Sequence, residues 1–467
     1  MSDIEIKQVK DGELAASFSQ LPDNESYTIA SRHETDVVQA ASLYTVFPNN
    51  TTPSGFPSVS SNTLDIAPNY MGTIKNFSLW EGTNISDSGL VDVNGGPFTP
   101  LVLFSNGEEG VWYEPSPTTT FISTANLTPC APGDACGFLL DKSKGVEYVN
   151  GSFTGTGPEL VLNGDFSNTN LVETNWIISS LTAAEVVEGK ANVTPLDSNV
   201  RRISQAVPTV VGKYYKWEFD YVKNTANRLW ITAGSSIGSD NAFFREVFSP
   251  SGKLSVIFKA VSSTTYLSLG VLGTNSTGEF DNVTFCELPG NHATQATAAA
   301  RPILRQSGSL YYLEFDGVDD YIAASYASPL SQPQTAIVGA TPFQTTGIMV
   351  GSIASSGNTR QLLYDNIYVF ARTQFDAGNI TNGIPYILTP VWNSTSSGLR
   401  INGSVAVSSG NVGGNTRDGE SIGAYGNGNS QHKNMHYFGH VSINRLLAAD
   451  EIDNTEAYLA EKSGVTL

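Results

Sequence analysis

Aromatic residues with polar neighbours are the residues of this sequence best suited to chemistry with a ligand. They gather in runs such as KYYKWEFDYV and RLWITAG. Sugar rings stack on flat aromatic side chains while their hydroxyl groups take hydrogen bonds. Trp217 and Phe219 alternate in KWEFDY and are expected in a core. The surface candidates are therefore Trp176, Tyr215 and Trp230.

Arg228 stands two residues before Trp230, so on a strand the two side chains share one face. A guanidinium beside an aromatic ring is able to bond the hydroxyl groups of a stacked sugar. We therefore predict carbohydrate binding by Trp176, Tyr215, Arg228 and Trp230. For each of them the alternative is an ordinary place in the core or at a sheet edge.

Other catalytic and metal-binding patterns are weak. No Gly-x-Ser-x-Gly elbow stands between a strand and a helix, and no phosphate-binding loop occurs. His432, His436 and His440 recur every fourth residue. On a strand this spacing places them on one face, about 13 Å apart, too far for one metal ion to bind two. We interpret them as a polar sheet face; the alternative is an ion shared on a trimer axis.

Three cysteines exclude a disulfide framework. Cys130 and Cys136 flank the turn-forming sequence APGDA, and both a disulfide and two free thiols fit this spacing. Cys286 lies in the apolar run NVTFCEL and is expected to be a small core residue.

The composition favours β-sheets. The chain has 467 residues, enough for several domains, and its 40% of hydrophobic residues excludes a disordered protein. Only 15% of the residues are charged, while Ser, Thr, Asn and Gly are abundant, as in strands and turns. The net charge of −19, without a basic patch, argues against nucleic acid and anionic lipid as partners. We expect no signal peptide and no membrane insertion, since no apolar segment is long enough.

Short apolar runs bounded by Gly, Ser or Asn predict strands along most of the chain. One block of such runs extends from Pro158 to Leu288, and another follows an Ala/Thr-rich connector. A short strand is expected at residues 101–104. The chain ends in one predicted helix, within ADEIDNTEAYLAEKSG, which has acidic residues in its first turn and Gly464 as its stop. The predicted fold class is all-β, with several β-sandwiches and a short C-terminal helix.

Two passages carry a family resemblance. The first is FSNGEEGVWYEPSPTTTF with GFLLDKS, and the second is GNHATQATAAARPILRQ with YYLEFDGVDDYI. Both resemble tailed-bacteriophage virion proteins built around a concanavalin A-like, laminin-G-like jelly roll. The ending INRLLAADEIDNTEAYLAEKSGVTL is similar to the last strand and helix of that domain. In simpler members the two passages almost adjoin, whereas roughly 140 residues separate them here. The resemblance therefore implies an inserted domain.

The inserted block resembles a carbohydrate-binding module with a galactose-binding-like jelly roll. The segments that carry this resemblance are ELVLNGDFSNTNLVETNWI, GKYYKWEFDY and GEFDNVTF. Related jelly rolls hold a structural ion where the loop of the first strand meets the last strand. The resemblance thus implies a structural Ca²⁺ at Asp165 and Asp281. The alternative is that both acids cap turns.

The concanavalin A-like fold also includes glycosidases, whose signature is Glu-x-Asp-x-x-Glu on one strand. Glu314, Asp316 and Asp319 in EFDGVDD come close to it. However, the last acid is Asp, and GVDD is typical of a turn that leaves the strand. We therefore predict that the protein is not an enzyme.

The resemblance implies four segments: an N-terminal virion-attachment region (1–100), the first segment of the concanavalin A-like domain (101–147), the inserted module (148–287) and the remainder with the helix (288–467). It implies a structural protein on the exterior of a phage virion, most simply a tail fibre or receptor-binding protein that contacts host-surface glycans. Other virion proteins are expected to bind its N-terminal region, and a homo-oligomer, with a trimer favoured, is expected. The alternatives are a capsid decoration, head-fibre or adaptor protein, and a glycan depolymerase.

Overall fold

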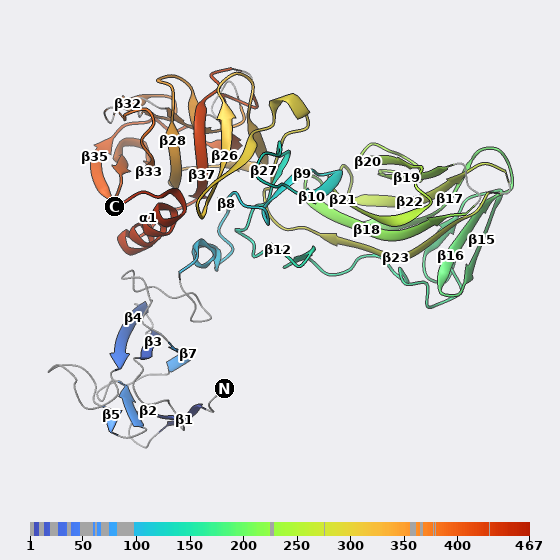
Figure 1. Ribbon diagram of the computed structural model, residues 1–467, viewed down its shortest axis with the longest axis horizontal. Coiled ribbons are helices and arrows are strands. Elements are labelled where there is room, and N and C mark those ends of the chain that lie inside the picture. The colour runs from blue at the N-terminus through green and yellow to red at the C-terminus, as the bar shows by residue number, and fades with distance from the viewer. Residues whose placement is uncertain are drawn as a thin grey trace. The chain divides into compact units, whose positions relative to one another are not determined.

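The computed structural model describes residues 98–467, apart from 225–227, 275, 355–360, 365–367, 377, 379 and 429, together with the backbone of seven strands between residues 4 and 81 (Figure 1). It divides into two units, residues 1–105 with 449–458 and residues 106–448 with 459–467. The all-β prediction is confirmed, and α1 (Ala449–Ser463) is the one α-helix among the described residues. None of the described helices has the length and apolar character needed to cross a membrane.

The first unit contains two small sheets. One has the order β1 (Ile4–Gln8), β2 (Leu14–Phe18), β6 (Thr63–Ile66), β5 (Val59–Ser60), and the other β4 (Gln39–Val46), β3 (Tyr27–Glu34), β7 (Ile74–Glu81). The strand expected at residues 101–104 is wrong: Pro100, with its fixed φ, begins the 3₁₀ helix η1 (Pro100–Phe104). Most of the region assigned to virion attachment, residues 1–100, lies outside the described residues.

The second unit contains a large β-sandwich. The order of one sheet is β25 (Ile303–Ser307), β26 (Leu310–Asp316), β37 (Asn434–Ile443), β28 (Gln334–Pro342), β33 (Tyr386–Trp392), β34 (Ser397–Ile401), β35 (Ser404–Gly410), and β8 (Gly110–Tyr113) also pairs with β37. The order of the other is β10 (Asn126–Pro129), β9 (Thr120–Ser123), β11 (Phe138–Leu139), β24 (Ala293–Thr294), β27 (Ile322–Leu330), β36 (Arg417–Ile422), β29 (Ile348–Gly351), β30 (Leu362–Tyr364), β31 (Tyr368–Phe370), β32 (Gln374–Asp376). Their inward apolar side chains form one core.

A smaller sandwich interrupts the large one. One five-stranded sheet has the order β14 (Trp176–Ile178), β17 (Val200–Pro208), β22 (Thr264–Leu272), β19 (Arg228–Gly234), β20 (Phe243–Val247); we call it the Trp230 sheet. The facing sheet has the order β15 (Thr182–Val187), β16 (Lys190–Pro195), β23 (Gly278–Glu287), β18 (Tyr214–Lys223), β21 (Ser251–Lys259). All ten strands lie between residues 176 and 287, whereas both large sheets combine strands from before and after this stretch (Figure 1).

The two parts of the large sandwich meet directly beside the insertion. Phe138 and Leu139 of β11 pair with Thr294 and Ala293 of β24. A hairpin of β12 (Glu147–Val149) and β13 (Ser152–Thr154) then leads the chain into the smaller sandwich. The chain therefore leaves the large sheet and returns to it at neighbouring positions.

A buried carboxylate fixes this meeting point. The Oδ1 atom of Asp141 accepts hydrogen bonds from the backbone N–H groups of Trp112 and Ser143, both at 2.9 Å. Its Oδ2 atom accepts one from the N–H of Asn291 at 2.7 Å. Asp141 precedes the insertion and Asn291 follows it, so one side chain joins the two parts of the interrupted domain. Burial raises the pKa of the Asp141 carboxyl, although these hydrogen bonds act in the opposite direction.

His292 completes this polar cluster. Its Nδ1 atom accepts a hydrogen bond from the N–H of Asp141 at 3.0 Å, and its Nε2 atom faces the carbonyl oxygen of Leu288 at 3.2 Å. The neutral imidazole with its proton on Nε2 satisfies both contacts. Burial, with a smaller effect of the Lys259 charge, lowers the pKa of His292 to about 3. The ring is therefore neutral across the physiological range.

An apolar cluster connects the two sandwiches. Phe121 and Phe138 of the large sandwich pack with Tyr214 and Ile257 of the smaller one. The hydroxyl group of Tyr214 donates a hydrogen bond to the carbonyl oxygen of His292 at 3.0 Å. Burial of these side chains gives the junction a core of its own.

Candidate functional site

Two of the predicted sugar-binding residues belong to the core of the smaller sandwich. Trp176 is 1% exposed, and its indole N–H donates to the carbonyl oxygen of Leu162 at 3.1 Å. Tyr215 is 2% exposed, stacks on Phe285 at 5.0 Å and accepts a hydrogen bond from the N–H of Val210 at 2.9 Å. Neither ring is available to a sugar, so the prediction is wrong for both.

Trp230 and Arg228 lie together on the outer face of the Trp230 sheet. Leu229 and Ile231 point into the core, and alternation turns Arg228 and Trp230 the other way. The Arg228 guanidinium carbon lies 5.5 Å from the centre of the Trp230 ring. Both side chains are partly exposed. The structure thus places these two residues side by side, on the face that the sequence predicted.

Strand β20 adds two residues that the sequence prediction missed. The Phe244 ring, 41% exposed, lies 4.8 Å from the Trp230 ring, centre to centre. An Oε atom of Glu246 lies 2.9 Å from an Nη atom of Arg228. The sequence FFREV contained the signal, because one Phe of an adjacent pair on a strand must face outward. Two aromatic rings and an ion pair therefore share one sheet face.

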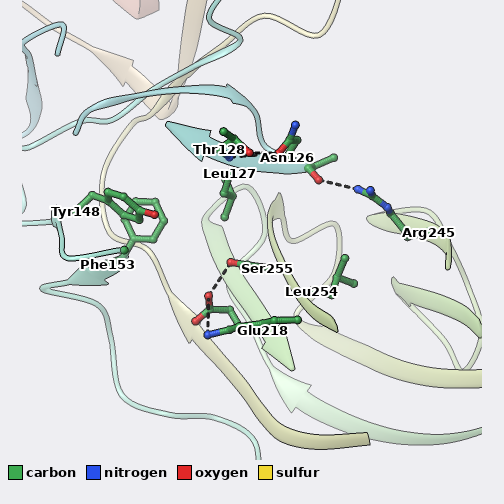
Figure 2. Close-up of a pocket in the computed structure, with 12 residues that line it drawn as sticks. Asn126, Leu127, Thr128, Tyr148, Phe153, Glu218, Arg245, Leu254 and Ser255 are labelled. Carbon is green, nitrogen blue, oxygen red and sulfur yellow. Dashed lines mark hydrogen bonds and ion pairs between the residues drawn. The ribbon is translucent and has the colours of Figure 1, made fainter. Parts of the chain in front are cut away.

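A pocket of about 320 Å³ lies at the junction of the two sandwiches (Figure 2). Asn126 and Thr128 of β10 line one side, Tyr148 and Phe153 of the entry hairpin another, and Glu218 of β18 the floor. Its mixture of rings and polar groups is chemically compatible with a small polar ligand.

The charged groups of this pocket already satisfy one another. Glu218 accepts a hydrogen bond from Ser255 at 2.7 Å and lies 2.6 Å from Lys216 Nζ. Burial acts to raise the pKa of Glu218, but these hydrogen bonds and the charges of Lys216 and Lys253 outweigh it, so the pKa lies below its usual value. Arg245 donates to a backbone carbonyl of the large sandwich at 2.8 Å. The Arg245 contact joins the two sandwiches, the others lie within the smaller one, and together they leave little for a ligand.

The two residues of the predicted calcium site each make local contacts. Asp165 Oδ1 accepts hydrogen bonds from the N–H of Ser167 at 3.2 Å and from its hydroxyl group at 3.0 Å. Asp281 Oδ1 accepts one from the N–H of Asn282 at 2.7 Å. These are the turn-capping contacts of the alternative interpretation. Within the described part of the chain, neither residue belongs to a group of three acidic, His or Cys side chains close enough to share an ion. Bound Ca²⁺ there would need backbone carbonyl and water oxygens as further ligands.

The calcium site stays a prediction that metal removal tests. If the ion is bound, restoring Ca²⁺ at about 1 mM to protein treated with a chelator raises its melting temperature. Asp165→Asn and Asp281→Asn should each abolish that rise, whereas Asp376→Asn, at an exposed turn, should not. Equal melting curves with and without Ca²⁺ contradict the prediction.

The acidic sequence EFDGVDD forms the end of a strand and a turn. Strand β26 ends at Asp316, and Gly317 has a φ of +77°. Carboxylate oxygens of Asp316, Asp319 and Asp320 lie within 4.8 Å of one another. Burial, with the neighbouring carboxylates adding to it, raises the pKa of Asp320 to about 7. Glu314 instead pairs with Arg305. The turn predicted for GVDD is present.

The three C-terminal histidines do not share a sheet face. The pairing of β37 with β28 shifts register at Phe438, and this extra residue reverses the alternation of side chains. His436 therefore stacks on Tyr312 at 4.2 Å, whereas His440 lies buried in the core. His432 precedes the strand. The expected common face is wrong because the sequence does not reveal the bulge.

His440 belongs to a buried ionic network around Glu420. Arg417 and the Tyr326 hydroxyl group both bond the Glu420 carboxylate, and His440 Nε2 lies 3.4 Å from it. The hydroxyl group of Tyr437 lies 2.7 Å from His440 Nδ1. Arg417, Glu420 and His440 are all fully buried. This closed network connects the two large sheets and presents no group to a substrate.

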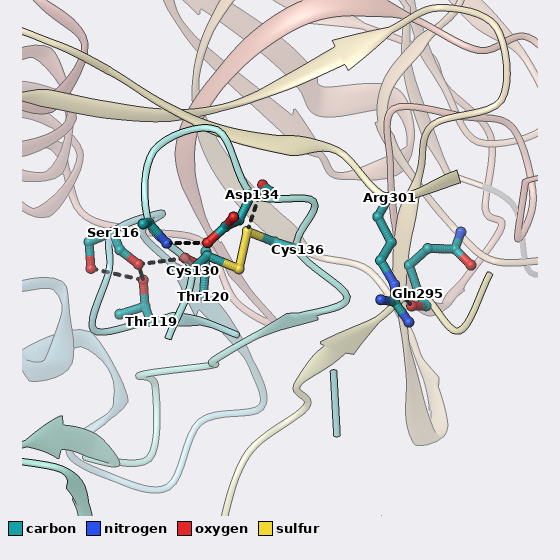
Figure 3. The surroundings of a disulfide bond; sticks show 9 residues. Ser116, Thr119, Thr120, Cys130, Asp134, Cys136, Gln295 and Arg301 are labelled. Atoms are coloured by element: carbon teal, nitrogen blue, oxygen red, sulfur yellow. Dashed lines mark hydrogen bonds between the residues drawn. A yellow bond between two sulfur atoms is a disulfide. The ribbon is translucent and has the colours of Figure 1, made fainter. Parts of the chain in front are cut away.

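Cys130 and Cys136 form a disulfide (Figure 3). The N–H of Cys130 donates to the carbonyl oxygen of Thr120 at 2.9 Å, and that of Cys136 to Pro302 at 2.9 Å. The short loop therefore attaches β9 to the chain that follows the insertion. Cys286 is a buried free cysteine, as predicted.

No protein-family model and no curated protein matches this sequence. Solved structures similar to it include a CBM4 structure, 17% identical over 27% of this chain and 99% of that one, with a TM-score of 0.23. The tandem CBM22-1–CBM22-2 domains of Paenibacillus barcinonensis Xyn10C are 12% identical over 61% of this chain and 97% of that one, with a TM-score of 0.23. Trypanosoma rangeli sialidase with the inhibitor DANA is 10% identical over 97% of this chain and 84% of that one, with a TM-score of 0.28.

TM-scores this far below 0.5 do not establish a common fold over the chain. Two of these structures are of carbohydrate-binding modules and one is of a sialidase. None of the three is described as a bacteriophage protein.

Proposed function

We propose that this protein binds glycans, without cleaving them, through the outer face of the Trp230 sheet. The observation that carries the proposal is the partly exposed ring pair of Trp230 and Phe244 beside the ion pair of Arg228 and Glu246. The rings offer an apolar platform to the faces of a sugar, while the charged pair offers donors and acceptors to its hydroxyl groups.

The carboxylates of this face support the proposal that the glycan is not cleaved. Glycosidases of the usual kind hold two carboxyl groups on opposite sides of the bond that breaks. Among the described strand residues of this face, Glu246 is the one carboxylate, and Arg228 engages it. Asp316, Asp319 and Asp320 gather on one turn of the other sandwich.

We further propose that the protein is a tail fibre or receptor-binding protein on the exterior of a tailed-phage virion. The sequence passages around LDKS and GNHATQATAAARP support this assignment. Several copies, as in a homotrimer attached by its N-terminal region, would convert weak single-site contacts into avidity. Immunogold labelling of intact particles tests the location: labelled fibres or tail tips support an adhesin, a labelled capsid shell favours a decoration protein, and unlabelled particles exclude both.

Replacing Trp230 tests glycan binding directly. Trp230→Ala removes the main stacking surface, and we expect affinity for the best ligand of a glycan array to fall at least about tenfold. Phe248→Ala is the matched control, since Phe248 is 62% exposed in the same sandwich but stands after the end of β20, outside the strands of this sheet. Equal losses in both variants, or none in Trp230→Ala, contradict the proposed site. Melting curves verify that both variants fold.

A further inference from the structure

Arg202 lies on the same sheet face as Trp230. The cross-strand register aligns Arg202 of β17 with Gly270 of β22, and Gly270 with Trp230 of β19. Neighbouring strands are about 4.8 Å apart, so the Cα atoms of Arg202 and Trp230 are about 10 Å apart. Gly270 separates them without a side chain, and a Cβ atom there would come within 2.5 Å of the Trp230 carbonyl oxygen. A ligand stacked on Trp230 would therefore lie within reach of a long cationic side chain.

The Arg202 guanidinium is half-buried and unpaired. Among the residues that the structure describes, no hydrogen bond or ion pair engages its nitrogen atoms. The other three arginines of this sheet have partners, Arg201 in Asp197, Arg228 in Glu246 and Arg245 in the carbonyl oxygen of Ala125. Burial, with the charge of Arg201 adding to it, lowers the pKa of Arg202, which is the direction expected for a cation that lacks a counter-ion.

The loop between β19 and β20 fixes the position of this cation. The guanidinium lies against Gly238, where the lack of a side chain makes room for it. The N–H of Gly238 donates to Ser268 Oγ at 3.1 Å, and Ser268 in turn contacts Ser204 Oγ at 2.9 Å. The loop therefore limits the space open to the guanidinium, which lowers the entropic cost of pairing with an anion.

We infer that the glycan bound at this face is acidic, and that Arg202 pairs with its carboxylate or sulfate group while a ring of the glycan stacks on Trp230. The inference rests on the proposed function. A guanidinium forms two parallel hydrogen bonds with a planar anion, and such charge-assisted bonds are the strong ones. An anionic ligand would also supply the counter-ion that the folded chain lacks. The protein's net charge of −19 offers no general attraction for polyanions, so recognition depends on this local cation.

Matched oligosaccharides test the inference in the full-length protein. The probes are the linear trimer of galacturonic acid, the neutral trimer obtained by reducing its carboxyl groups, and a sulfated trimer of galactose. We expect the wild-type protein to bind at least one acidic trimer at least tenfold more tightly than the neutral one. Arg202→Gln should abolish this preference without changing the affinity for the neutral trimer. Arg202→Lys should retain part of it, since the charge remains but the planar fork is lost.

Two controls distinguish a specific role of Arg202 from a general loss of positive charge and from the binding of free anions. Arg201→Gln removes the same charge from the adjacent residue and should leave the preference intact. Inorganic phosphate alone should compete only weakly, because it cannot stack on Trp230. If Arg202→Gln does not fold, the inference is still tested by the wild-type preference for an acidic trimer and by the partial loss of that preference in Arg202→Lys.

The possible failures are distinguishable. Equal, Trp230-dependent binding of acidic and neutral trimers overturns the inference and leaves the proposed function intact. Strong competition by phosphate, together with no effect of Trp230→Ala, identifies a site for free anions and also overturns it. If no glycan of the array binds and Trp230→Ala has no effect, the proposed function fails and the inference fails with it.

Discussion

Asp141→Ala is expected to lower the free energy of unfolding of the large sandwich by about 3 kcal/mol or more. The substitution leaves three backbone N–H groups without their acceptor, those of Trp112 and Ser143, whose hydrogen bonds are buried, and that of Asn291, whose hydrogen bond is partly buried. Each unsatisfied buried donor costs about 1–3 kcal/mol, and relief of the buried negative charge offsets part of the sum. Urea denaturation followed by circular dichroism measures the loss.

Two further substitutions make this experiment specific. Asp141→Asn keeps an acceptor for Trp112 and Ser143 but turns an amide N–H₂ toward the N–H of Asn291, so it should lose less than Asp141→Ala. Asp376→Ala, at an exposed turn where the carboxylate caps Gly378, should cost less than about 1 kcal/mol. If Asp141→Ala costs no more than Asp376→Ala, Asp141 does not stabilise the meeting of the two chain segments.

The interrupted architecture was accessible from the sequence because its signals are local. Each strand is a short apolar run, and LDKS and GNHAT stand at the two ends of the interruption. Asp141 and His292, which bond each other across it, belong to these two motifs. The insertion was expected from the resemblance, because these two motifs almost adjoin in simpler members of the family, whereas roughly 140 residues separate them here.

The errors at the candidate site have two physical causes. Alternation along β18 places Tyr215 on the same face as Trp217 and Phe219, so a period of two over the whole strand predicts a core position for Tyr215. Trp176 stands on a strand of only three residues, too short for any periodic signal. The burial of Trp176 depends on contacts with residues outside its own strand.

The remaining features depend on contacts between residues far apart in the sequence, which local patterns do not predict. The bulge at Phe438, which separates His436 from His440, depends on the partner strand. Arg202 is one of two adjacent arginines, and only the return of the loop around Gly238 distinguishes it from Arg201. Local patterns predict which face of a strand a residue occupies, whereas pairing and burial on that face depend on residues far away in the sequence.

The second large effect is a loss of stability in acid caused by His292. In the unfolded chain a histidine takes up a proton near pH 6.5, whereas His292 in the folded protein does so only near pH 3. Its contribution to stability is therefore complete above pH 6.5 and decreases as the pH falls toward 3. The decrease is about 1.4 kcal/mol per pH unit, or about 2–3 kcal/mol between pH 7 and pH 4.5.

Comparison with His292→Gln isolates this contribution. Asp320, whose pKa is raised to about 7, acts in the opposite direction, because the folded state retains a proton that the unfolded state loses above about pH 4. The total pH dependence therefore mixes both signs.

His292→Gln should be less stable than the wild type at pH 7, because glutamine cannot bond both Asp141 and Leu288 in the same geometry. Since the variant has no imidazole to protonate, the difference between the two proteins should shrink by about 2–3 kcal/mol at pH 4.5. A difference that stays constant from pH 7 to pH 4.5 would mean that His292 titrates alike in the folded and unfolded chains, and that its two hydrogen bonds do not exclude the second proton.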